Sequence, residues 1–171
     1  MQRINLRFRT SVTVFVLLLL TLCITTCLGQ DSSLEQDSSM KQLNLIKGTW
    51  VLKSIYQTQN VEGPSVSEQK KLLGTSITLD GGVLKACGQS VPVKSITVIE
   101  VSSDDFLTNT LARFNDVGVD TTSIKEVVIN GRQSGTCFGA FPIPGQDVYI
   151  KSRDELLIDF EGVFYRAVRK K

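Results

Sequence analysis

Apolar and polar residues alternate in short runs along this chain, and turn residues separate the runs over most of its length after residue 44. Runs of about four to eight residues with this alternation are typical of strands half-buried in an antiparallel sheet. We expect strands at 50–55, 77–79, 83–87, 93–101, 124–129, 147–151, 156–160 and 163–168. The pattern therefore predicts an all-β fold, an antiparallel barrel or sandwich of about eight strands.

Two short helices interrupt this pattern. Ser65 and Glu68 have the spacing of a capping box, and Gly74 supplies a stop, which predicts a helix between them. Apolar residues at helical spacing predict a second helix over 102–114, with acidic residues in its first turn. Asn130-Gly131 predicts a tight hairpin turn after the strand at 124–129.

The amino-terminal segment has the composition of a secretory signal. Three arginines precede the nearly uncharged apolar run 12–28, which predicts a signal peptide over 1–29. The polar stretch 30–42 then forms a flexible spacer, and the folded domain occupies 43–171. Two alternatives stay open, namely an uncleaved membrane anchor and lipid attachment at Cys27. The expected location is secreted or periplasmic, with membrane attachment as the alternative.

Removal of this segment changes the charge and the cysteine content. The remaining chain has 16 basic and 17 acidic residues, so it lacks the positive field that nucleic-acid binding requires. Of the four cysteines, only Cys87 and Cys137 remain. An even pair in an oxidising compartment predicts one intramolecular disulfide between them.

The chain has no histidine, which excludes the commonest general base and most zinc and haem ligand sets. Adjacent carboxylates such as Asp104/Asp105 and Asp159/Glu161 are best interpreted as helix caps and turn charges. We therefore expect a protein without catalytic activity, cofactor or metal. A hydrolase that uses carboxylates alone stays an alternative.

The two ends of the predicted barrel carry a resemblance to a known family. Gly48-Thr49-Trp50 opens the first strand, and Asp159 to Arg166 forms a closing hairpin. Together with the strand pattern after residue 44, these motifs resemble the lipocalin-like (calycin) barrels. An arginine of the closing hairpin is expected over the Trp50 ring, with Arg166 as the first candidate and Arg169 as its competitor.

The resemblance implies that the barrel binds a small hydrophobic ligand. The candidate residues for its cavity are aromatic, namely Phe138, Phe141, Tyr149, Phe160 and Phe164. The alternative is a protein-interaction module of the cell envelope, an inhibitor or assembly factor with a filled barrel. Its expected contact is the apolar loop 138–145, because apolar residues in a loop often mark a binding surface.

Overall fold

The computed structural model describes residues 41, 43–58, 63–131 and 135–171. The expected signal peptide and nearly all of the expected spacer lie outside the described residues. The strands are β1 (Gly48–Thr58), β2 (Ser76–Asp80), β3 (Val83–Ala86), β4 (Gln89–Ser102), β5 (Ser123–Gly131), β6 (Thr136–Cys137), β7 (Phe141–Pro142), β8 (Asp147–Ile150), β9 (Glu155–Phe160) and β10 (Val163–Arg169). The helices are α3 (Val66–Lys71), α4 (Ser103–Thr110) and the 3-10 helix η1 (Phe114–Val117), and residues 43–46 are also helical.

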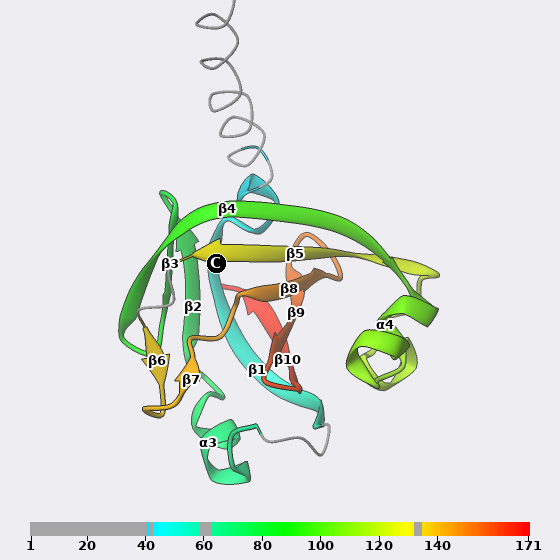
Figure 1. The fold of residues 1–171 in the computed structure, drawn as a ribbon, viewed down its shortest axis with the longest axis horizontal. Helices are drawn as coiled ribbons and strands as arrows, with labels where there is room; N and C mark the ends of the chain where they lie inside the picture. The colour runs from blue at the N-terminus through cyan, green and yellow to red at the C-terminus, as the bar shows by residue number, and fades with distance from the viewer. Residues whose placement is uncertain (1–40, 42, 59–62, 132–134) are drawn as a thin grey trace, which may run out of the picture. The chain divides into compact units, whose positions relative to one another are not determined.

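Eight of the strands form one antiparallel sheet that closes on itself in the order β1-β10-β9-β8-β5-β4-β3-β2 (Figure 1). Strands β6 and β7 pair only with each other in a separate two-stranded sheet. The predicted all-β fold with about eight antiparallel strands is therefore confirmed.

The alternation of side chains divides the apolar residues between two cores, because successive residues of a strand point to opposite faces. Along β10, Val163, Tyr165 and Ala167 belong to the large core inside the barrel. Phe164, between them, belongs to a smaller core on the outer face, together with Phe106 of α4. The α4 and η1 segments thus cover part of the outside of the sheet.

Both helices begin where the sequence predicts. The Ser65 hydroxyl and the Glu68 side chain form the reciprocal capping box of α3. The Ser102 hydroxyl caps α4 by accepting from the backbone N–H of Asp105. The second helix is shorter than predicted, because Leu111 adopts a left-handed conformation (φ 57°) that ends α4.

The predicted hairpin turn at Asn130-Gly131 is wrong. Both residues belong to β5, where Asn130 lies opposite Ser95 and Gly131 opposite Val93 of β4. The register shifts between Val93 and Ser95, so β4 has a bulge beside these residues. Pairing with β4 continues the strand through the dipeptide that the local sequence marks as a turn.

Candidate functional site

The structure does not bring the five candidate cavity residues together. Phe160 is buried in the barrel core, and Phe138 and Phe141 pack against that core while half-buried. Tyr149 and Phe164 lie in the outer core beneath α4. The register explains the division, since Phe160 lies opposite Val163 and Phe164 therefore points to the other face.

Side chains of the chain itself occupy the barrel interior. The largest of those on strands have less than 2 % of their surface exposed, and they come from β1, β2, β3, β9 and β10. They include Trp50, Leu52, Ile77, Leu79, Leu84, Leu156 and Tyr165. Burial of this kind is what a packed barrel core requires.

Trp50 closes one end of the barrel. Its indole N–H donates to the carbonyl of Ile46 at 2.8 Å, and the guanidinium carbon of Arg169 lies 4.1 Å from its ring centroid. Arg169 also donates to the carbonyl of Lys47 at 2.6 Å. The arginine is Arg169 because it lies directly opposite Trp50 in the pairing of β1 with β10.

The prediction that Arg166 lies over the Trp50 ring is therefore wrong. It lies opposite Ser54, and its guanidinium binds the Glu155 carboxylate at 2.7 Å and 2.9 Å. Burial alone would raise the pKa of Glu155, but hydrogen bonds from Arg166 and Lys151 hold it below its ordinary value. Arg166 thus fastens β10 to β9 on the outer face.

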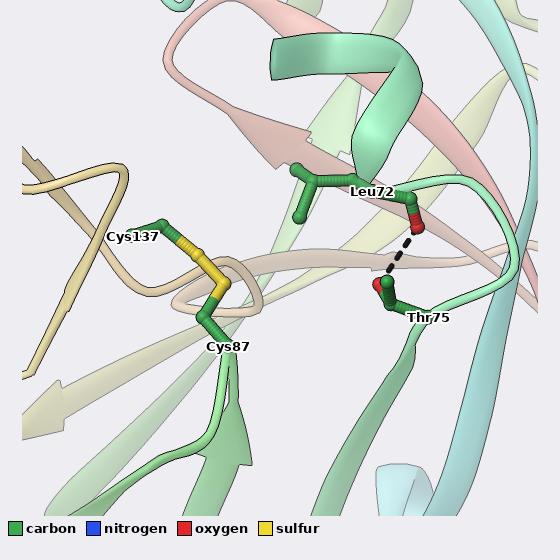
Figure 2. Close-up of a disulfide and its surroundings, with 4 residues drawn as sticks. All are labelled: Leu72, Thr75, Cys87 and Cys137. Carbon is green, nitrogen blue, oxygen red and sulfur yellow. Dashed lines mark hydrogen bonds between the residues drawn. A yellow bond between two sulfur atoms is a disulfide. The ribbon is translucent and has the colours of Figure 1, made fainter.

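A disulfide joins Cys87 and Cys137, whose Cα atoms are 5.7 Å apart. Cys87 lies in the turn between β3 and β4, and Cys137 ends β6 (Figure 2). In Figure 2 the side chain of Leu72, the C-cap of α3, extends from the end of that helix toward the disulfide. The predicted pairing of the two cysteines agrees with the structure.

The disulfide anchors residues 135–145, which we call the strap. Apolar burial also holds the strap, because Cys137 and Ile143 are each 1 % exposed within the barrel core. At Gly145, a Cβ atom would lie 3.0 Å from Ile77 and 3.3 Å from Leu84, both inward-facing. The loop 138–145, which we expected to present apolar residues to a partner, therefore lies largely against the barrel. Gly139 and Ala140 are its exposed part.

A different surface exposes large apolar side chains. Helix α4 buries Phe106 completely against the outer core, yet it leaves Leu107 38 % exposed and its C-cap Leu111 69 % exposed. A groove of about 420 Å³ runs beside this helix. We call this surface the α4 face, and it comprises Asp104, Leu107, Leu111, Arg113, Phe114, Val119 and Asp120.

A second groove, of about 360 Å³, adjoins the first at Val119 to Thr121 and reaches Lys151. The Lys151 ammonium binds the Glu155 carboxylate at 3.0 Å and donates to the Tyr56 hydroxyl at 2.8 Å and the Val117 carbonyl at 3.2 Å. These contacts use its three donor hydrogens. The network thus ties η1 to the sheet, and η1 contributes Phe114 to the α4 face.

Three carboxylates and a tyrosine line the outer faces of β5, β8 and β9. Asp147 lies opposite Asp159, and Tyr149 lies opposite Glu126, to which its hydroxyl is hydrogen-bonded. Desolvation raises the pKa of Asp159 to about 6, with further contributions from the neighbouring negative charges. Desolvation also raises the pKa of Asp147 and of Glu126. Sequence reasoning interpreted Asp159 as a turn charge and did not group it with Asp147, Glu126 and Tyr149, because only the pairing of β5, β8 and β9 brings these residues together.

The described part of the chain contains no group of three or more His, Cys, Asp or Glu side chains that could hold a metal ion. Nor does any helix among those residues combine the length and the apolar character needed to cross a membrane. Comparisons of the chain with known protein families, with curated proteins and with solved structures found no match.

Proposed function

We propose that this protein is an exported, non-enzymatic interaction module, whose lipocalin-like barrel is a rigid support for the α4 face. The observation that carries the proposal is the exposure of two large apolar side chains, Leu107, which lines the groove, and Leu111, the C-cap of the same helix. Exposed apolar side chains that adjoin one another are typical of protein-binding surfaces. Export is supported by the basic and apolar amino-terminal sequence and by the Cys87–Cys137 pair.

The α4 face is firmly mounted, which favours binding because little ordering is needed when a partner docks. Phe106 fixes α4 through ring contacts with Phe114 at 5.1 Å, Tyr149 at 5.1 Å and Phe164 at 5.6 Å. The neighbouring loop is held by Lys151, which donates to the Val117 carbonyl. The partner thus meets a surface that is already formed.

The charges around the groove favour a basic partner. Four exposed carboxylates belong to the α4 face or to the residues next to it in sequence, whereas Arg113 is the basic residue that lines its groove. These carboxylates belong to Asp104, Asp105, Asp116 and Asp120. Because opposite charges steer association, the surface fits a protein segment with an apolar anchor and flanking Lys or Arg residues.

A pull-down from the envelope of the host organism tests the proposal. Leu111→Arg removes an apolar contact and opposes a basic partner, so a specific partner is lost or strongly reduced. The matched control is Val66→Arg, because Val66 of α3 is similarly exposed (63 %) and lies outside the groove. Equal recovery of every protein by the wild type and both variants would exclude the α4 face as the contact.

A second candidate function is binding of a small hydrophobic molecule in the barrel. It is favoured by the strap, which covers inward-facing Ile77 and Leu84 and is held partly by a reducible bond. Native mass spectrometry of the protein from its own host, with a fluorescent hydrophobic dye as a second probe, tests this function. A ligand-free protein that binds no dye would rule it out.

A further inference from the structure

A third groove lies at the end of the barrel that Trp50 closes. Its volume is about 640 Å³, and one of its lining residues is Arg169, whose guanidinium covers the Trp50 ring. The lining comes from the chain just before β1, from the end of β8 and the turn after it, and from the end of β10. We call this surface the basal groove, and it comprises Asn44, Leu45, Lys47, Ile150, Ser152, Arg153, Asp154 and Arg169.

Basic side chains outnumber acidic ones in the basal groove. Lys47, Arg153 and Arg169 line it, together with a single carboxylate, that of Asp154. The guanidinium of Arg169 holds the other two basic residues close together, because it donates to the backbone carbonyl of Lys47 at 2.6 Å and to that of Arg153 at 3.1 Å. Basic and acidic residues are nearly equal in number after residue 29, so this positive excess is local.

One of the three basic side chains is available to an external anion. Lys47 binds the carboxylate of Asp80 at 3.2 Å, and Arg169 lies 3.5 Å from the carboxylate of Asp154. Arg153, in contrast, is exposed, and its side chain makes no hydrogen bond or ion pair with any residue that the structure describes. Its guanidinium can therefore bind a phosphate without giving up a contact within the protein.

The basic charge continues along the chain beyond β10. Lys170 and Lys171 follow Arg169, and both are exposed and lack a side-chain partner within the described part of the chain. The N–H of Lys170 donates to the carbonyl of Thr49 at 2.8 Å, so this basic pair starts beside the first residues of β1. Together with Arg153, the pair places three positive charges without a carboxylate partner at this end of the barrel.

An exposed apolar side chain lies among these charges. Leu45 lines the basal groove and is 45 % exposed, whereas its neighbours Leu43 and Ile46 are buried in the barrel core. An apolar side chain beside several basic ones is typical of contact with an anionic bilayer surface. In such a contact the apolar side chain enters the headgroup layer, and the basic side chains bind the lipid phosphates.

The path of the chain brings this end of the barrel toward a membrane. The apolar run 12–28 precedes Leu43 in the sequence, and it is either retained, lipidated at Cys27 or removed. In the first two cases, segment 28–42 can separate the bilayer from Leu43 by no more than about 50 Å. Because Leu43 and Ile46 are fixed in the core, such a tether reaches the domain at the basal groove.

We propose that the basal groove docks on the surface of a membrane that contains anionic phospholipids. Arg153, Lys170 and Lys171 bind the headgroup phosphates, and Leu45 enters the layer between them. The basal groove shares no residue with the α4 face, so this proposal does not depend on the proposed function.

Vesicle binding tests the charge contacts. The processed protein from its own host is sedimented with vesicles of phosphatidylcholine, with and without phosphatidylglycerol. The wild type is expected to bind the anionic vesicles at least about ten-fold more tightly, and the difference shrinks as salt is added. Arg153→Gln is expected to weaken anionic binding about five-fold. The matched control is Lys70→Gln, which makes the same charge change at an exposed residue of α3 outside the groove and leaves binding unchanged.

Leu45→Gln tests the apolar contact separately. It is expected to weaken binding to the anionic vesicles without changing the salt dependence, whereas Arg153→Gln reduces the salt dependence. Far-UV circular dichroism and Trp50 fluorescence check that every variant is folded. Equal binding of the wild type to both kinds of vesicle overturns the proposal, and so do equal effects of Arg153→Gln and Lys70→Gln. A wild type that ignores anionic vesicles but binds a soluble acidic protein overturns it in favour of a protein partner.

Discussion

Cys87→Ser cuts the covalent link between the β3–β4 turn and the strap. Cys137 lies in the barrel core and stays buried when its partner is lost, whereas Cys87 is in an exposed turn. A serine at residue 87 therefore changes little in the packing of the native state. The main effect of this substitution is expected in the unfolded chain, which gains the freedom that the cross-link denied it.

The length of the closed loop sets the size of the effect. The two cysteines are 50 residues apart in sequence, for which loop-closure entropy gives about 4 kcal/mol at 25 °C. Native disulfides of small exported domains contribute about 2–5 kcal/mol. We therefore expect Cys87→Ser to lower the free energy of unfolding by about 2–5 kcal/mol.

Urea unfolding followed by the fluorescence of Trp50 measures this difference, because Trp50 is the only tryptophan and is 1 % exposed in the barrel. The matched control is the wild type with a thiol reductant, which is expected to unfold at nearly the urea concentration that unfolds the variant. Reductant is expected to leave the variant unchanged. Equal stability of the oxidised wild type and the variant, or two alkylatable thiols in the exported protein, would refute the reasoning.

Two further predictions concern groups that the barrel brings together. Arg169→Ala is expected to lower the free energy of unfolding by about 1–3 kcal/mol, since it removes the cation–π contact with Trp50 and a hydrogen bond to a carbonyl; urea unfolding measures this, and an unchanged midpoint contradicts it. Burial raises the pKa of Asp159 from 3.8 to about 6, so the native state holds a proton that the unfolded chain releases, and wild-type stability falls as pH rises through this window. The change in the free energy of unfolding caused by Asp159→Asn is therefore expected to be more stabilising at pH 7 than near pH 4, by about 1–3 kcal/mol. Urea unfolding at both pH values measures the two changes, and equal changes contradict the prediction.

Local signals in the sequence determined most of the elements. Alternation of apolar residues placed the strands, because a half-buried strand must present one face to the core. Ser65 with Glu68, and Ser102, marked the helix starts because their side chains satisfy backbone N–H groups of the first turn. The count and setting of the cysteines predicted the pairing of Cys87 with Cys137.

Sequence left open which residues share a face and which strands are neighbours. Asn130-Gly131 has the local character of a turn, yet pairing with β4 keeps both residues in β5. The sequence offered Arg166 as the first candidate and Arg169 as its competitor for the place over Trp50, and only the register of β1 with β10 selects Arg169.

The candidate surfaces likewise depended on the tertiary structure. The aromatic residues that we grouped in one cavity separate because Phe164 and Tyr149 face α4, whereas Phe160 faces the barrel interior. The part of β4 beyond Val93 has no β3 partner, because β3 begins only at Val83, opposite Pro92, while β4 continues to Ser102. Local sequence sets the propensity of each strand, but pairing between residues far apart in the chain decides what each face and edge of the strand meets.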